Sequence, residues 1–293
     1  MGVAWPTHSF LFRRRLYSAS MELPEITVLA GQMGTEIVGK RVSDVQVLNE
    51  KCLNMSLGRF RETIVGRRVR SVEPRGKWVF IGLDQGYTLL FNTGMGADVI
   101  HFDAGDGLPE KHQIRLTLDD GSGFTVRVWW FCYLHLVPSD GLSRHGLTGG
   151  MGMSPLDDGF TLDRFRGLLS GRRGGVKGFL MNQRNVAGIG NVYIQDILFG
   201  ARLHPLRRIN TLSDGEVEAL YGSMRAVLGE SIGVGGLAYE RDFYGRPGGY
   251  GKERYRVAYR PGLPCPVCGA TIKKIRTGST ASFICPSCQR LEG

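Results

Sequence analysis

The sequence contains no long hydrophobic run, although hydrophobic residues make up 42% of its 293 residues. No apolar stretch approaches the roughly 18 to 20 residues that a membrane-spanning helix requires, so we expect no membrane partner. Cysteine is also scarce before residue 265, where only Cys52 and Cys132 occur. This scarcity is consistent with a reducing, intracellular setting.

Acidic residues are in the minority, with 27 Asp and Glu against 37 Lys and Arg, and the net charge is +10. Such an excess suits a polyanion such as nucleic acid, although a basic surface without a partner fits the charge alone equally well. Charged residues at 22% are typical of a globular protein, and the length predicts two domains with full cores.

Residues 1–20 lack acidic residues altogether and contain three consecutive arginines, Arg13 to Arg15. The alternatives are a transit-like leader, an artificial extension, or residues ahead of the true start codon. We expect this segment to lie outside a fold that begins at Met21. Organelle targeting by this segment stays open. Without it the net charge is still +7, because only the three arginines are removed.

The pattern from Pro24 to Asp158 predicts a helix followed by many short strands. Ile26, Leu29, Met33 and Ile37 recur at spacings of three and four, which is one face of a helix ending near Gly39. The period then changes to two, which indicates strands. The strand positions are Val42–Val47, Val69–Val72, Trp78–Leu83, Tyr87–Phe91, and a hairpin that sets Ile114, Leu116 and Leu118 opposite Phe124, Val126 and Val128. This pattern predicts a β-sandwich or barrel with a helix at its edge. The stretch 139–158 is rich in Gly, Ser and Pro and is predicted to be a linker.

Beyond the linker the apolar spacing becomes helical, and Ser213 with Glu216 fits a capping box. Within this region, Gly188 and Gly190 flank a single Ile, which predicts a tight turn. Asn191 follows at the position of a helix N-cap. Such a turn can leave backbone N–H groups free to bind a phosphate, with Lys177 among the nearby donors. On its own, the pattern also fits a turn without a ligand.

The last four cysteines have the spacing C-x2-C-x16-C-x2-C, from Cys265 and Cys268 to Cys285 and Cys288. This is the spacing of a four-thiolate zinc ribbon, and it predicts one structural Zn²⁺. Disulfide bonds between the same residues are the alternative.

Taken together, these motifs resemble the formamidopyrimidine-DNA glycosylase / endonuclease VIII family over nearly all of Met21–Gln289. The matching stretches are Glu22-Leu-Pro-Glu25, Arg75-Gly-Lys77, Gly94-Met95-Gly96, Pro109-Glu-Lys-His112, Lys177–Tyr193 and the cysteine pairs. The resemblance implies an α+β protein. It would have an N-terminal helix and β-sandwich over 21–138, a helix–two-turns–helix domain over 159–251 and a zinc finger over 255–293.

The family's activity implies roles for individual residues. A base-excision DNA glycosylase with AP-lyase activity extrudes a damaged base, and an N-terminal amine attacks C1′ of the sugar to give a Schiff base. By position, the amine would belong to Met21, Glu22 would transfer protons and Lys77 would assist. Met95 would enter the gap left by the extruded base. The other residues that would contact DNA are His112, Trp130, Phe131, Lys177 and Asn191. The partner would be double-stranded DNA with abasic or oxidised-base sites, bound by a monomer in the cytoplasm or at the nucleoid.

The sequence departs from the family at three positions. Met21 replaces the family's N-terminal proline, whose secondary amine is the nucleophile. Trp130 and Phe131 stand approximately where the family has a strand-intercalating arginine and its neighbour, and Thr280 replaces the zinc-finger arginine. A catalytically weak or inactive damaged-DNA-binding protein of the same fold is therefore an alternative. A generic zinc-ribbon nucleic-acid binder does not explain Glu22–Glu25.

Overall fold

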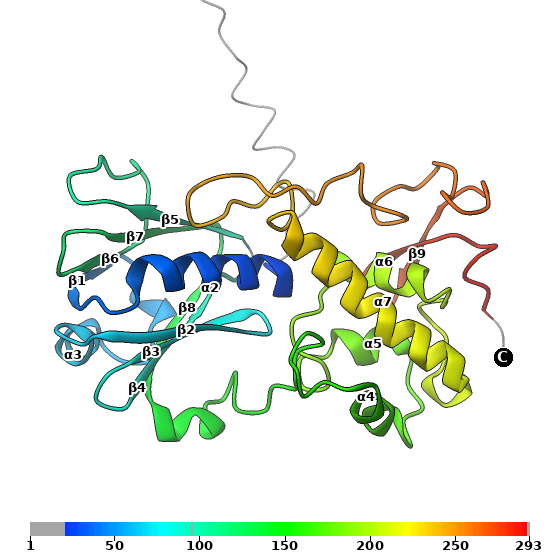
Figure 1. Cartoon of the computed structure of the whole chain (residues 1–293), viewed down its shortest axis with the longest axis horizontal. Coiled ribbons are helices and arrows are strands. Elements are labelled where there is room, and N and C mark those ends of the chain that lie inside the picture. The colour runs from blue at the N-terminus through cyan, green and yellow to red at the C-terminus, as the bar shows by residue number, and fades with distance from the viewer. Residues whose placement is uncertain (1–20, 95, 292–293) are drawn as a thin grey trace, which may run out of the picture.

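The computed structural model describes residues 21–94 and 96–291 of the chain. The extension expected at residues 1–20 and the base-gap residue Met95 lie outside these described residues. The described chain forms a β-rich N-terminal half and a helical C-terminal half, which lie side by side along the long axis (Figure 1).

The N-terminal half is a sandwich of two antiparallel four-stranded sheets beside helix α2 (Leu23–Ile37). One sheet has the order β1 (Val42–Val47), β6 (Ile114–Leu118), β7 (Gly123–Val128) and β5 (Ala97–Phe102). The other has the order β2 (Val69–Arg75), β3 (Trp78–Leu83), β4 (Tyr87–Asn92) and β8 (Tyr133–Pro138). A short helix, α3 (Leu57–Ile64), covers one end.

The hydrophobic patterns explain this architecture. Ile26, Leu29, Met33 and Ile37 of α2 are buried in the sandwich core, as their spacing predicts. The predicted hairpin is confirmed, because Ile114 pairs with Val126 and Leu116 with Phe124, and all four side chains are buried.

The stretch 139–158, predicted to be a linker, begins with the 3₁₀ helix η2 (Ser139–Arg144). It packs against the outer face of the second sheet, where Leu142 and Met151 contact a buried group that includes Trp78 and Phe80. The connection therefore also covers apolar sheet surface.

The helical half consists of α4 (Leu162–Leu169), α5 (Val176–Met181), α6 (Tyr193–Gly200) and α7 (Asp214–Gly233). The predicted capping box at α7 is confirmed, since Glu216 N donates to Ser213 Oγ at 3.3 Å and Ser213 N donates to Glu216 Oε2 at 2.8 Å. In the part of the chain that the structure describes, no helix has the length and apolar character needed to cross a membrane.

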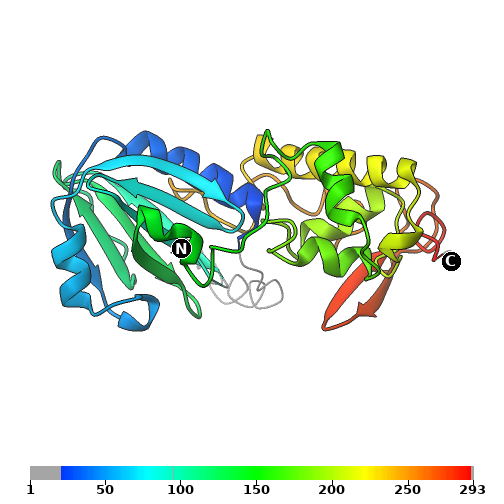
Figure 2. The same cartoon turned by 90° about the horizontal axis from the view of Figure 1, so that it is seen from below.

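The C-terminal hairpin, β9 (Lys273–Thr277) and β10 (Thr280–Ile284), projects at the far end of the helical half (Figure 2). Its buried residues pack with Phe199 of α6. Between α7 and this hairpin, the Gly-rich segment returns to the sandwich, where the Phe243 side chain is buried in the core. Phe243 N donates to Gln32 Oε1 at 2.8 Å, so this segment is anchored to α2.

Candidate active site and zinc ribbon

The Glu22 carboxylate lies where the two halves of the molecule meet. Its side chain is fully buried, and it accepts hydrogen bonds from two backbone groups of the turn before α6. Gly190 N donates to Oε2 at 2.7 Å and Val192 N donates to Oε1 at 2.9 Å. The N–H groups that we expected to be free for a phosphate therefore bind a carboxylate of the same chain, and that prediction is wrong.

Two glycines with positive φ make this meeting possible. Gly76 has φ +58° and Gly188 has φ +99°, and both lie in tight turns. A Cβ on Gly76 would stand 2.9 Å from Ala187 Cβ, and one on Gly188 would stand 2.6 Å from Leu23 Cβ. Leu23 N also donates to Gly188 O at 3.0 Å. The β2–β3 turn, the start of α2 and the turn before α6 thus pack backbone against backbone.

Lys77 is brought to Glu22 by the same packing. It occupies the two-residue turn between β2 and β3, and Asn92 Nδ2 donates to its carbonyl oxygen at 2.7 Å. A Cβ on Gly190 would collide with both Glu22 Oε1 and Lys77 Nζ, so the carboxylate and the ammonium group are neighbours. The structure thus brings together two of the predicted catalytic side chains.

The electrostatics of Glu22 suit proton transfer. Burial raises the pKa of Glu22, because desolvation penalises the carboxylate. The Lys77 charge and the N–H groups of Val192 and Gly190 act in the opposite direction and lower it. Because its pKa is raised, this carboxyl group holds a proton more readily than a solvated glutamate, which suits a group that must both give and take a proton.

A second buried carboxyl group, Glu25, supports the first. Glu22 N donates to Glu25 Oε2 at 3.0 Å, and Tyr193 OH donates to Oε1 at 2.5 Å. Leu237 N donates to Oε1 at 3.0 Å. Burial is the main cause that raises the pKa of Glu25 to about 7. The sequence showed Glu25 only as part of a family motif, although its position three residues after the N-cap residue of α2 signals a capping contact.

Met21 directly precedes Glu22, and its side chain is buried in the sandwich core. Burial of this side chain anchors Met21 next to the Glu22 carboxyl group.

Asn191 does not cap α6, contrary to our prediction. The residue at the N-cap position is Val192, whose φ of −79° and ψ of −61° are already helical. Asn191 instead accepts hydrogen bonds from Gln195 Nε2, at 2.9 Å to its backbone oxygen and 3.2 Å to Oδ1. The physical reason is that the N–H groups an N-cap side chain would bind have other partners, because Ile194 N donates to Gly190 O at 3.3 Å and the Tyr193 N–H interacts with Glu22.

The ammonium group of Lys177 binds the C-terminal hairpin, a partner that its place in the sequence did not indicate. Its side chain is only 4% exposed, and Nζ donates to atoms of the β9–β10 hairpin. The acceptors are Ser282 Oγ at 2.8 Å, Thr280 Oγ1 and Ala281 O at 2.9 Å each, and Thr277 Oγ1 at 3.1 Å. Burial lowers the pKa of Lys177 to about 8. The lysine therefore joins the helical half to the hairpin.

The remaining predicted DNA contacts lie on surface loops. Trp130 is 76% exposed and Phe131 is 45% exposed, and both precede β8. The Phe131 carbonyl packs so closely against Gly94 that a Cβ there would overlap it. His112 Nδ1 lies 3.0 Å from Pro109 O in another loop. Their roles in DNA binding stay predictions.

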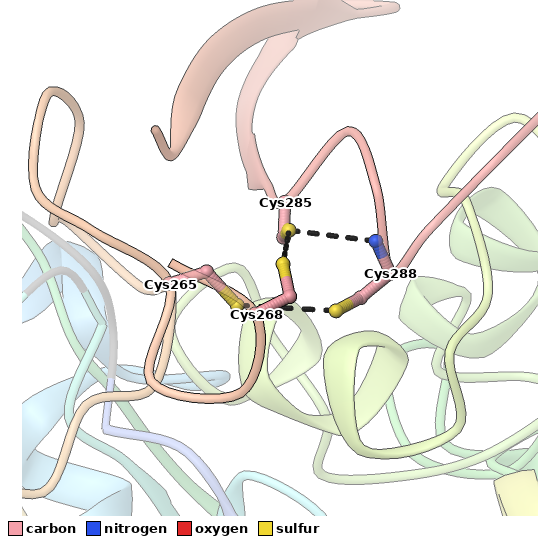
Figure 3. A group of neighbouring side chains, drawn as sticks. All are labelled: Cys265, Cys268, Cys285 and Cys288. Atoms are coloured by element: carbon pink, nitrogen blue, oxygen red, sulfur yellow. Dashed lines mark hydrogen bonds between the residues drawn. The ribbon is translucent and has the colours of Figure 1, made fainter. Parts of the chain in front are cut away.

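The four C-terminal cysteines converge as their spacing predicts (Figure 3). Their sulfur atoms all lie within 4.8 Å of one another, with 3.9 Å between Cys265 and Cys288 and 3.4 Å between Cys268 and Cys285. Tetrahedral zinc with Zn–S bonds of about 2.3 Å needs sulfur separations of about 3.8 Å. The donor set fits, and the ribbon is a Cys₄ site for one structural Zn²⁺.

Three known protein domains match this chain in succession. The formamidopyrimidine-DNA glycosylase N-terminal domain matches residues 21–127, its H2TH domain matches residues 151–241, and the zinc finger found in FPG and IleRS matches residues 262–291. H2TH denotes the helix–two-turns–helix fold. The order and extent agree with the sandwich, the helical half and the ribbon.

Whole-chain relatives agree with these matches. The formamidopyrimidine-DNA glycosylase of Roseiflexus sp. (strain RS-1) is 37% identical over 275 residues, which cover 92% of this chain and 99% of the relative. That of Pelotomaculum thermopropionicum is 33% identical over 285 residues, with the same coverage. The chain belongs to the formamidopyrimidine-DNA glycosylase family.

Solved structures share the fold. Lactococcus lactis Fpg in complex with abasic-site DNA has a TM-score of 0.83 at 24% identity, covering 92% of this chain and 99% of that one. MutM in complex with DNA containing carbocyclic 8-oxo-G has a TM-score of 0.82 at 24% identity, with the same coverage.

Proposed function

We infer that this protein is a DNA glycosylase with AP-lyase activity that acts on oxidised purines and abasic sites. The observation that carries the inference is the buried Glu22 carboxyl group, held between the Lys77 ammonium group and the N–H groups of Gly190 and Val192. Relatives that share 33% to 37% of the sequence are named formamidopyrimidine-DNA glycosylase, which agrees with this chemistry.

The proposed reaction uses the α-amine of a chain that begins at Met21. With the damaged base extruded from the duplex, the amine lone pair attacks C1′ and the bond between sugar and base breaks. Glu22 gives a proton to the departing base and can later accept one, while the Lys77 charge helps to stabilise the carboxylate form. The C1′–O4′ bond then breaks, O4′ takes up a proton and the nitrogen loses one, which gives the Schiff base. This Schiff base permits β-elimination, in which loss of a C2′ proton expels the 3′ phosphate and cuts the strand.

We propose that a monomer binds double-stranded DNA across the two halves. The exposed aromatic residues Trp130 and Phe131, with Met95, would fill the gap left by the extruded base. His112, Lys177 and Asn191 would contact phosphates. For Lys177 this contact requires its ammonium group to exchange an acceptor in the β9–β10 hairpin for a phosphate oxygen.

Borohydride trapping on abasic DNA tests the proposal. Protein beginning at Met21 should give a stable protein–DNA adduct at the Met21 nitrogen. Protein that retains residues 1–20 should give far less, because its residue 21 nitrogen is an amide without a usable lone pair. A matched pair of purified proteins that differ only in this extension provides the control.

Lys77 is a second candidate for the attacking amine, because its Nζ already lies beside the Glu22 carboxylate. Equal trapping by both lengths of protein, lost in Lys77→Ala, would favour it. If neither length traps DNA nor releases a base while both still bind lesion duplexes, the protein is a damaged-DNA binder instead.

A further inference from the structure

Two cysteines outside the zinc ribbon lie together although they are far apart in the sequence. Cys52 ends the 3₁₀ helix η1 (Glu50–Cys52), and Cys132 immediately precedes β8. Both side chains are buried and line the same cavity, and the interaction between the two thiols shifts their pKa values in opposite directions. They are thus a pair of neighbouring thiols.

The backbone that follows each cysteine is fixed. Leu53 and Leu134 form a parallel β-bridge directly after the two cysteines. Asn54 makes two hydrogen bonds to the backbone of Leu136. Asn54 Nδ2 donates to Leu136 O at 3.0 Å, and Leu136 N donates to Asn54 Oδ1 at 3.0 Å. The segments that carry the two cysteines are therefore held beside one another.

The thiols also share an opening large enough for a small oxidant. Both line a cavity of about 50 Å³, together with Trp130 and Phe131. This volume exceeds the roughly 10 to 15 Å³ of such space that one water molecule needs. A hydroperoxide the size of hydrogen peroxide fits these dimensions.

The two thiols differ in character. The hydrogen bond from the Cys132 thiol lowers the pKa of Cys52, whereas the hydrogen bond with Cys52 and burial raise the pKa of Cys132. Cys52 is accordingly the better nucleophile, and Cys132 remains a thiol that can react second.

We propose that Cys52 and Cys132 form a peroxide-sensitive dithiol, whose oxidation to a disulfide restrains the loop that carries Trp130 and Phe131. The Cys52 thiolate attacks one peroxide oxygen, the O–O bond breaks, and the departing hydroxide takes up a proton to become water. The sulfur of Cys132 then attacks the Cys52 sulfenic acid, breaks the S–O bond, loses its proton and releases a second water. Two thiols are oxidised, one peroxide is reduced, and a dithiol reductant reverses the change.

Oxidation at Cys132 acts on the adjacent loop. A disulfide brings the two sulfur atoms to about 2 Å and ties residue 132 to η1. Phe131, the preceding residue, packs against Gly94 and lies edge-on to the Tyr133 ring with centroids 5.6 Å apart. The tether thus restrains the Trp130–Phe131 loop and its contact at Gly94. The consequence for DNA rests on the proposed function, in which this loop enters the base stack.

Mass spectrometry of the full-length zinc-loaded protein tests the disulfide. After brief treatment with a small excess of hydrogen peroxide, the intact mass should fall by about 2 Da, as expected for loss of two hydrogens. Nonreducing peptide mapping should find Cys52 joined to Cys132, with zinc retained. If the zinc ligands oxidise first while both of these cysteines remain alkylatable, the proposal is wrong.

DNA affinity tests the restraint on the loop, with Cys52→Ser as the matched control. Oxidised wild-type protein should bind an abasic-site duplex about tenfold more weakly than reduced protein, and Cys52→Ser should show no such change after the same treatment. If the disulfide forms and affinity is unchanged, the restraint is refuted. Base release by the reduced protein tests the proposed glycosylase activity separately. A failure of the loop restraint can therefore be distinguished from a failure of that activity.

Discussion

The Glu22 and Lys177 sites both bury an ionisable side chain almost completely, yet they are stabilised in different ways. Glu22 has a cationic neighbour, Lys77, and binds backbone N–H groups of a rigid turn. The ammonium group of Lys177 is held by hydroxyl and carbonyl oxygens of the β9–β10 hairpin, which carry no net charge. The first site therefore depends on the contact between the two large halves, whereas the second depends on the zinc ribbon.

Removal of zinc should have the largest effect, because it should disrupt the Lys177 site and leave the Glu22 site intact. Chelation should unfold the ribbon, because zinc binding of about 10 kcal/mol or more is coupled to folding in such modules. In hydrogen exchange, the amides of residues 273–284 should lose protection, while those of Gly190 and Val192, which bind Glu22, should keep it. Simultaneous loss at both places would show that the two sites are one cooperative unit. Metal analysis that finds no zinc in the pure protein would overturn the Cys₄ assignment.

Glu22→Gln should affect only the first site. We expect base release to fall by about 10² to 10⁴, because a positioned general acid or base contributes a factor of that size. DNA affinity should change little, since the carboxyl group is buried and faces the protein's own N–H groups. The exposed Glu218→Gln on α7 is the matched control for loss of one negative charge. Normal turnover in Glu22→Gln would remove Glu22 from the mechanism.

Glu25 gives the first site a pH dependence. Its pKa rises from 4.5 to about 7 on folding, so the folded state favours the protonated form. The associated stability is complete below about pH 4.5 and is lost as pH rises through 7, a change of about 3 kcal/mol. Urea unfolding at pH 5 and pH 8 should show this decrease in the wild type and much less of it in Glu25→Gln. Identical pH dependence in both proteins would contradict the assignment.

Lys177→Ala should have the smallest effect on function. If Lys177 contacts a phosphate, all duplexes should bind more weakly by a similar factor, and the dependence of log affinity on log salt concentration should decrease by about 1. The exposed Lys252→Ala controls for loss of a positive charge elsewhere. A change confined to lesion preference would show that Lys177 has a different role.

Local patterns in the sequence predicted α2 and the hairpin of β6 and β7 correctly, although they did not indicate α3, β5 or β8. The errors concern contacts across long separations. The spacing of Ile26, Leu29 and Met33 was enough to define α2, because neighbours on a helix face are close in sequence. The prediction that Asn191 caps α6 was wrong, because Glu22, 168 residues before Gly190, binds the turn. The partners of Lys177 begin 100 residues away in the hairpin. The local spacing of residues carries no information about such contacts. Only the family resemblance predicted that Glu22 and Lys77 share one site.

The close backbone contact between Gly76 and Gly188 has a consequence for biosynthesis. Because Glu22 binds the amides of Gly190 and Val192, its site cannot form on a partly made chain. At translation rates of about 5 to 20 residues per second, roughly ten seconds separate the synthesis of residue 77 from that of residue 190. During that time Glu22 and Lys77 exist without the turn that positions the carboxyl group. The buried Glu22 site is therefore completed only when the helical half is also present.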